Sequence, residues 1–261
     1  MNKKRVRQYL ILVDEMARLS LKADSERYFL GYLWWILEPL LWVAIFYLVF
    51  EVFLKSGTHD FLAFLAVGKL NFVWFSKSIS QSSSSLIAAR GLIGRLDLPK
   101  WLFPIATCQE GLYKQIFVIA LLLSMLIYKG YQPTFFWLFL LPLLFLQYLM
   151  TITVALVSAL LVCVRQDFQY LVQLGMVLLM FLSGIFWDVN SISDASMREH
   201  LFLFNPMATM LDSYRDILIR GTSPSGERLM VVVTEVLVLG ALVGGLYVKL
   251  HFWIAKRVIT Q

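Results

Sequence analysis

The sequence has 261 residues, of which 59% are hydrophobic and 15% are charged, and its formal net charge is +6. A soluble domain usually carries about 25% charged residues, so this chain has too few polar side chains to cover its apolar ones in water. The composition therefore excludes an ordinary soluble domain and indicates an integral membrane protein. The cations are spread between apolar stretches, which is typical of a membrane interface and not of a nucleic-acid-binding patch.

Residues 1–29 predict a cytoplasmic helix that lies on the inner membrane surface. Val6, Leu10, Val13 and Ala17 recur at helical spacing, and charged residues occupy the other faces. A helix with one apolar stripe and polar flanks is suited to the membrane interface. A solvated N-terminal extension is the alternative, and the continuous apolar stripe disfavours it.

Six apolar stretches follow, each long enough to cross a bilayer, which takes about 20 residues. They are residues 32–54, 61–79, 104–128, 135–164, 168–188 and 229–250. We therefore expect an all-α integral membrane protein with six transmembrane helices in a single domain, residues 1–261. Most Lys and Arg residues lie before the first stretch, between the second and third, and in the C-terminal tail. The positive-inside rule then puts both termini in the cytoplasm.

Two connecting segments carry a pattern of their own. Residues 82–103, on the cytoplasmic side, contain Gly91, Gly94 and Pro99, which predict short helical pieces. Residues 189–228, on the outer side, contain apolar pieces too short to span. We expect them to form short helices that enter the outer leaflet, because backbone at that depth must satisfy its own hydrogen bonds. A plain extracellular loop is the alternative.

Three ionisable residues interrupt the predicted spans near the inner side of the membrane. Glu38 and Glu110 each lie about 10 Å inside their helices at about 1.5 Å per residue, and Lys77 falls near the inner end of the second span. Such groups usually face the bundle interior and find partners. We predict a buried charge cluster in which Lys77 neutralises Glu38 or Glu110. A diphosphate-binding site is the alternative, and the two carboxylates disfavour it. Pro39 predicts a kink that turns the surface helix into the bilayer.

Several catalytic and cofactor motifs are absent. No G-x-x-x-x-G-K-[ST] loop occurs, because Leu70 follows Gly68 and Lys69, so the chain is not expected to bind ATP in that mode. The three histidines fall in separate segments, and both cysteines lie in apolar runs, so no metal site, cofactor site or catalytic triad is predicted. This pattern favours transport over catalysis.

Four stretches resemble, in order, motifs of the polysaccharide-export ABC transporter permeases. They are GYLWWILEP, RLDLPKWLFPIA, VRQDFQYLVQLGMVLLMFLSGIFW and FNPMATMLDSYRDIL. The sequence departs from the family pattern at two places near the ends of the fifth span: Gln166 separates Arg165 from Asp167, and Gly184 stands where proline is frequent.

The resemblance implies a transport permease, not an enzyme, that works as a homodimer with two copies of a separate ATPase subunit, which would bind the ATP and Mg²⁺. Its cargo would be an undecaprenyl-diphosphate-linked polysaccharide crossing the bacterial inner membrane, first of all the O-antigen of lipopolysaccharide, with capsule and teichoic acid as alternatives. No nucleic acid partner is implied, and membrane lipid surrounds the chain.

The same resemblance makes residues 82–103 the coupling segment that docks on the ATPase. Four charged residues there are candidates for ion pairs with it: Arg90, Arg95, Asp97 and Lys100. Ordinary positive-inside anchoring is the alternative, and for Lys100 the sequence supports the two interpretations equally.

A channel for a glycan should present aromatic rings, since sugar faces carry C–H patches that stack on them. Trp35, Trp42 and Phe46 share one helical stripe of the first span, and the fifth span adds Phe181 and Phe186. We predict that these residues line the channel. Packing against lipid or the protein core remains the alternative for each ring.

Two other classes of protein fit the sequence less well. A membrane enzyme acting on polyprenyl-linked sugars should concentrate acidic or basic residues in its membrane-edge loops as a metal-diphosphate site, and the inner loops have no acidic cluster. A secondary transporter usually shows an internal repeat, and we find none.

Overall fold

The computed structural model describes residues 3–27, 29–53 and 61–260, and every regular element among them is helical, as predicted. The first half contains α1 (Lys3–Arg27), η1 (Gly31–Leu33), α2 (Trp34–Tyr47), η2 (Leu48–Phe53), α3 (Phe61–Ser83), α4 (Ser85–Ala88), α5 (Arg90–Ile93) and α6 (Leu102–Tyr128). The second half contains η3 (Phe135–Phe139), α7 (Leu140–Val164), α8 (Phe168–Leu182), η4 (Val189–Ser191), α9 (Ala195–Phe204), α10 (Pro206–Arg215), η5 (Asp216–Arg220), α11 (Gly226–Lys249) and α12 (His251–Thr260).

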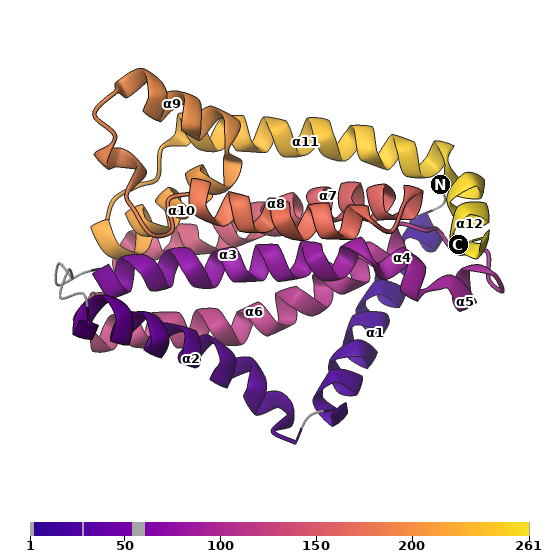
Figure 1. Cartoon of the computed structure of the whole chain (residues 1–261), viewed down its shortest axis with the longest axis horizontal. Helices are drawn as coiled ribbons and strands as arrows, with labels where there is room; N and C mark the ends of the chain where they lie inside the picture. Colours follow the sequence, from indigo (N-terminus) through magenta and orange to yellow (C-terminus); the bar gives the residue numbers. More distant parts are fainter. Residues whose placement is uncertain (1–2, 28, 54–60, 261) are drawn as a thin grey trace.

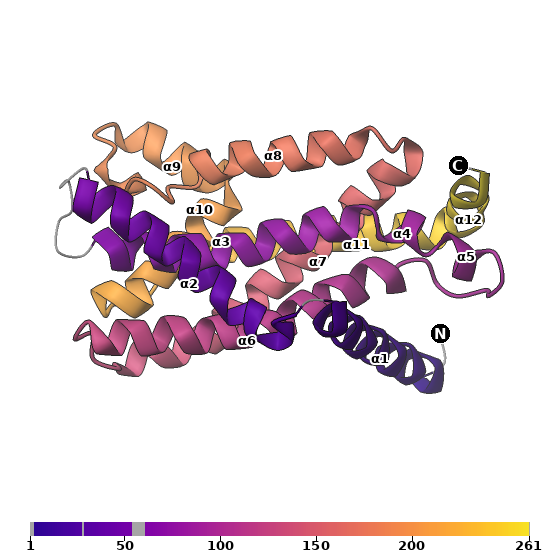
Figure 2. The same ribbon diagram turned by 60° about the horizontal axis from the view of Figure 1, so that its bottom comes forward.

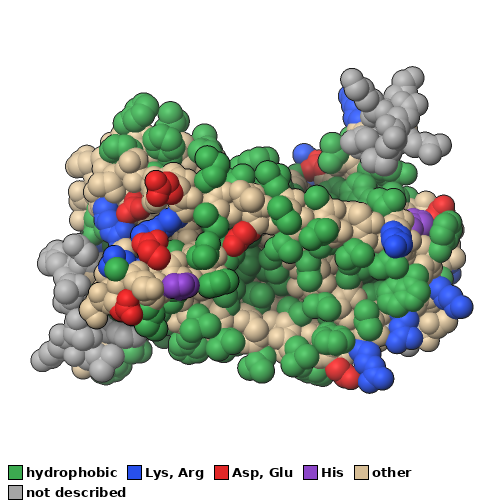
Figure 3. Space-filling view, turned by 90° about the horizontal axis from the view of Figure 1, so that it is seen from above, with side chains coloured by type: hydrophobic (Ala, Val, Ile, Leu, Met, Phe, Trp, Pro, Cys, Tyr) green, Lys and Arg blue, Asp and Glu red, His purple; other side chains and the backbone are tan. Residues whose placement is uncertain are grey.

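The long helices run lengthwise through the molecule, and the short ones gather at its two ends (Figure 1). Both termini lie at one end, together with α4, α5 and α12. At the opposite end, α9 and α10 cover the bundle, and the view in Figure 2 shows the same division. Hydrophobic side chains cover the length of the molecule, and charged ones gather mainly toward the ends (Figure 3), as expected for a chain that sits in a bilayer.

Among the described residues, four helical stretches are long and apolar enough to cross a membrane: Phe61–Ser83, Leu102–Tyr128, Phe135–Val164 and Gly226–Lys249. A bent pair of helices, Arg7–Arg27 and Gly31–Ile45, makes a fifth candidate if it counts as one span. The four single stretches correspond to the second, third, fourth and sixth predicted spans. The helical part of the predicted fifth span is shorter than expected, because α8 has 15 residues and ends at Leu182.

The end of α8 has a local cause. The N–H of Ser183 still bonds to the Leu179 carbonyl at 2.9 Å, but Gly184 has φ +69°. A left-handed residue directly after a helix is a common C-terminal stop, and glycine adopts it without steric cost. A Cβ at Gly184 would lie 2.6 Å from Val189 Cγ2, so the turn also requires a residue without a side chain.

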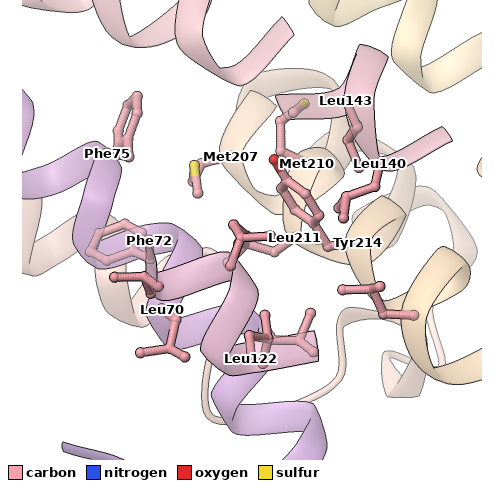
Figure 4. Packing of buried hydrophobic residues seen from close by; sticks show 14 of the residues in the cluster. Leu70, Phe72, Phe75, Leu122, Leu140, Leu143, Met207, Met210, Leu211 and Tyr214 are labelled. Atoms are coloured by element: carbon pink, nitrogen blue, oxygen red, sulfur yellow. The ribbon is translucent and has the colours of Figure 1, made fainter. Parts of the chain in front are cut away.

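The core forms around α3, which is buried along most of its length. Side chains of α3, α6, α7 and α10 meet in one cluster that includes Leu70, Phe72, Leu122, Met210 and Tyr214 (Figure 4). Lipid tails are as apolar as these side chains, so close packing and interhelical hydrogen bonds, more than removal from water, hold such a bundle together.

Buried amides link three of these helices. Gln115 of α6 donates to the Asn71 side chain of α3 at 3.2 Å, and Gln147 of α7 donates to the Asn71 carbonyl at 2.9 Å. A polar group left without a partner at this depth is costly. The network therefore fixes how α3, α6 and α7 face one another.

Helix α1 places its apolar face against the start of α6. Val13 and Ala17 are buried, as the stripe predicts, but Leu10 is 60% exposed, and the side chain of Val6 lies outside the described residues. The change of direction into α2 is 100° and falls between Arg27 and Gly31. The predicted turn at Pro39 is therefore wrong: Pro39 lies inside α2, and the bend occurs before that helix, where Gly31 has φ +50°.

Candidate functional site

A cavity of about 430 Å³ lies between α2, α3 and α6. Its apolar wall contains four tryptophans: Trp34, Trp35, Trp42 and Trp74. Its polar wall contains Asp24, Glu38, Lys77, Ser78, Gln81, Lys114 and Gln115. The Trp74 indole N–H is buried and has no hydrogen-bond acceptor among the described residues. Aromatic faces beside a few fixed polar groups are the usual make-up of a ligand pocket.

The predicted ion pair between Glu38 and Lys77 is present. It joins α2 to α3, and the two side chains are 32% and 50% exposed. Pro39 follows Glu38 directly, and it removes the N–H that would bond to the Trp35 carbonyl. The carboxylate and its cation therefore stand at an irregular turn of α2, on the rim of the cavity.

Glu110 does not share this cation, so the alternative pairing with Lys77 is wrong. Its partner is Lys114, one turn further along α6, at 2.8 Å. Lys114 also bonds to Asp24 at the end of α1, at 2.7 Å. The i, i+4 spacing of Glu110 and Lys114 was a usable signal in the sequence, but Asp24 could not be found that way, because only the tertiary fold brings α1 beside α6.

The aromatic stripe of the first span faces this cavity in part. Trp35 and Trp42 both line it, and the Lys114 ammonium lies 5.4 Å from the Trp35 ring centroid. The Lys69 ammonium lies 5.2 Å from the Trp42 ring. The side chain of Phe46 lies outside the described residues.

The aromatic residues of the fifth span lie elsewhere. The Phe181 and Phe186 rings are in contact, with centroids 5.7 Å apart and planes tilted by 32°. Phe181 is 56% exposed, whereas Phe186 packs on the core. The structure thus brings Trp35 and Trp42 together at one cavity and leaves Phe181 outside it.

The segment of residues 82–103 forms the short helices α4 and α5, as its glycines predict. Its four charged candidates differ in surroundings. Arg95 is exposed, and no ion pair forms to it within the described part of the chain. Arg90 donates to the Ile259 carbonyl at 2.6 Å. Lys100 is only 3% exposed and faces Asp97 and His251, so its ammonium is an internal group and not a surface charge.

An ionic network at the opposite end was missed by the sequence analysis. Arg220 bonds to Asp212 at 2.8 Å, to Asp216 at 2.6 Å and to Asp188 at 3.3 Å. Arg228 adds a contact with Asp212 at 3.6 Å. Burial raises the pKa of Asp216, and the hydrogen bond from Arg220 lowers it. The network ties the turn after α8 to α10, η5 and the start of α11.

Arg215, a charged side chain that is only 1% exposed, lies next to this network. Its guanidinium carbon lies 3.4 Å from the Phe64 ring centroid, and its nitrogens point to the carbonyls of Phe64 and Ile185. Gly68 of α3 leaves room for it, because a Cβ there would come within 2.6 Å of Arg215 Nη2. The segment 189–228, which contains α9, α10 and η5, is therefore fastened to the bundle and is not a plain loop.

These features define a class of protein: a helical membrane subunit with a polar-aromatic cavity between its spans and helical segments at both ends. Across the described residues, no group of three or more His, Cys, Asp or Glu side chains is placed to hold a metal ion.

The chain belongs to the ABC-2 type transporter family, whose model matches residues 16–219. Members of this family are non-catalytic transport permeases, so the sequence-based conclusion that the chain is a permease and not an enzyme is confirmed. Membership of this family implies partnering ATPase subunits.

The chain is similar to two named relatives over most of their length. The chain is 26% identical over 232 residues to the O-antigen export system permease protein RfbA of Myxococcus xanthus, covering 89% of each chain. It is 27% identical over 205 residues to the O-antigen export system permease protein RfbA of Klebsiella pneumoniae, covering 78% of each.

Proposed function

We propose that this chain is the transmembrane subunit of an ABC transporter that exports an undecaprenyl-diphosphate-linked polysaccharide, with the O-antigen of lipopolysaccharide as the first candidate. The observation that carries the proposal is similarity to O-antigen export permeases along nearly the whole chain. ATP and Mg²⁺ are bound by two copies of a partner ATPase, and hydrolysis there drives the movement.

The proposed topology has six spans in the bacterial inner membrane with both termini in the cytoplasm. The first span is the continuous helix of η1, α2 and η2, and the fifth is α8, which at about 1.5 Å per residue covers roughly 22 Å. An even number of crossings agrees with the two termini lying at one end (Figure 1). The excess of Lys and Arg at that end favours the cytoplasm.

The channel forms between two copies of the chain. Helix α8 has no buried residue within the subunit, and its exposed apolar side chains include Leu171, Leu174 and Leu178. Residues of α2 such as Leu40 and Leu41 are exposed as well. Since α8 buries no residue within its own subunit, α2 and α8 are the proposed faces toward the partner subunit.

The cavity between α2, α3 and α6 provides rings for sugar faces beside hydrogen-bonding groups. Its two lysines, Lys77 and Lys114, are already paired with three carboxylates, Glu38, Asp24 and Glu110, so the cavity suits a neutral sugar better than a diphosphate. Trp35, Trp42 and Phe46 would carry the stacking contacts on the first span, and Phe181 and Phe186 would line the path on the fifth.

A complementation experiment tests the proposal. In cells that lack this chain, lipid-linked polymer should accumulate inside and disappear from the surface, and the wild-type chain together with an active ATPase should restore it. Polymer that still reaches the surface when the ATPase is inactivated would refute the proposal. Alanine at Trp35, Trp42 and Phe46 together should lower export at normal protein levels. Unchanged export would show that this aromatic stripe does not line the channel.

A further inference from the structure

The C-terminal helix α12 packs directly against the segment that the proposed function assigns to ATPase docking. Ile254 and Val258 of α12 are fully buried in a cluster with Leu86 of α4 and Ile93 of α5. The cluster continues into α6, α7 and α11 through Phe103, Leu156, Ala159, Cys163, Val243 and Tyr247. In Figures 1 and 2, α12 and α5 lie together at the end of the bundle that holds the C-terminus.

Hydrogen bonds hold α12 on both sides. Arg90 of α5 donates to the carbonyl of Ile259 in the last turn of α12, at 2.6 Å. Arg257 of α12 donates to the carbonyl of Val164, the last residue of α7, at 2.8 Å. A cation beside the final carbonyls of a helix is favourable, because those carbonyls lack partners within the helix and carry the negative end of its dipole. Helix α12 therefore bridges α5 to α7.

His251 joins the first residue of α12 to the same segment. Its Nε2 lies 3.0 Å from Asp97 Oδ1 and 3.3 Å from Lys100 Nζ, and Lys100 lies 3.4 Å from Asp97. Neutral imidazole has one N–H; when Nε2 carries it, it donates to Asp97, and Lys100 pairs with the same carboxylate. Hydrogen bonds from His251 and then Lys100 lower the pKa of Asp97, which favours its ionised form.

The outer side of this assembly offers cations around apolar side chains. Leu92 of α5 and Leu96, just after it, are 48% and 50% exposed. Arg95, between them, and Lys256 of α12 are exposed as well. A partner that matches this surface has an apolar groove with an acidic rim.

We infer that the ATPase-docking surface is composite, formed by the 82–103 segment and the C-terminal helix α12 together, with His251 as the positioning residue that holds the two in register. This inference rests on the proposed function, since it names the face of the chain that the ATPase contacts. It adds α12, which the sequence motifs of the coupling segment do not include.

The first test is charge reversal on α12. Lys256→Glu should reduce co-purification of the ATPase by several-fold, as reversal of a rim charge weakens association, and the effect should shrink at high salt. Lys22→Glu, at an exposed cation near the C-terminal end of α1, is the control and should leave co-purification unchanged. If Lys256→Glu binds the ATPase as the wild type does, α12 is not part of the surface.

The second test isolates the positioning role of His251. One hydrogen bond shifts the equilibrium between docked and displaced α12 by about fivefold, so His251→Ala should lower the polymer exported per ATP hydrolysed by up to that factor. His251→Gln, which keeps a polar group near Nε2, should recover most of it. Asp97→Ala should lower it at least as much, because it also removes a partner of Lys100, and the double variant should be no worse than Asp97→Ala alone, because His251 acts through Asp97.

Protein level in the membrane is measured for every variant. If His251→Ala fails to accumulate, the comparison of His251→Gln with Asp97→Ala carries the test. Normal export per ATP in Asp97→Ala would overturn the positioning role, as would full additivity in the double variant. Failure of the proposed function would look different, since the wild-type chain would then support no ATP-dependent export at all.

Discussion

Gly68→Ala is the substitution whose effect the structure defines most closely. The added methyl carbon would lie 2.6 Å from Arg215 Nη2 and 3.5 Å from Arg215 Cζ. The guanidinium cannot swing aside freely, because Arg215 is 1% exposed and its charged group lies on the Phe64 ring. Either the helices separate slightly or the guanidinium leaves its site.

The magnitude follows from two costs and one gain. Overpacking a buried site costs about 1–3 kcal/mol, and loss of a desolvated cation–π contact costs up to about 2 kcal/mol. Replacing glycine by alanine within a helix returns roughly 0.5–1 kcal/mol. We therefore expect a net destabilisation of about 2 kcal/mol, which corresponds to a melting temperature lower by roughly 5 °C.

Thermal unfolding in detergent, followed by the fraction that stays monodisperse on size exclusion, measures this effect. Gly244→Ala is the matched control, since Gly244 also lies inside a helix but its Cβ would meet nothing within 4 Å. That variant should be as stable as the wild type or slightly more stable. If Gly68→Ala unfolds at the temperature of Gly244→Ala, the argued fit between Gly68 and Arg215 is wrong.

Three further predictions follow from single contacts. Glu38→Gln should weaken export, and Lys77→Glu should weaken it more strongly, because like charges then face each other. The exchanged pair, Glu38→Lys with Lys77→Glu, should recover activity in the same export assay. Equal activity of all variants would contradict a role for this pair. Asn205→Ala should lower the free energy of unfolding by about 1 kcal/mol. The Asn205 side chain accepts from the Ala208 N–H at the start of α10 and donates to Ser183 at 3.1 Å. An unchanged melting temperature would show that this cap contributes nothing. Arg95→Glu should reduce ATPase association in a salt-dependent way without changing the melting temperature, because Arg95 is exposed, and normal association would remove it from the docking surface.

The local patterns in the sequence anticipated much of the fold. Apolar length predicted the helices α3, α6, α7 and α11, and the glycines around residue 94 predicted the short pieces α4 and α5. These features depend on neighbours a few residues apart, which is the range over which periodicity and turn residues act. The end of α8 was misjudged, because an apolar run continues past Leu182 while the backbone turns at Gly184.

The sequence by itself determined that this chain is an all-helical membrane permease, and it found the charges Glu38, Lys77 and Glu110 that lie among its spans. Only the tertiary structure decided their partners. Lys77 pairs with Glu38, and Glu110 pairs with Lys114, which also bonds to Asp24. Asp24 lies 90 positions before Lys114 in the chain. The physical reason is that hydropathy and spacing fix which segments enter the membrane, whereas an ion pair depends on which faces of distant helices meet.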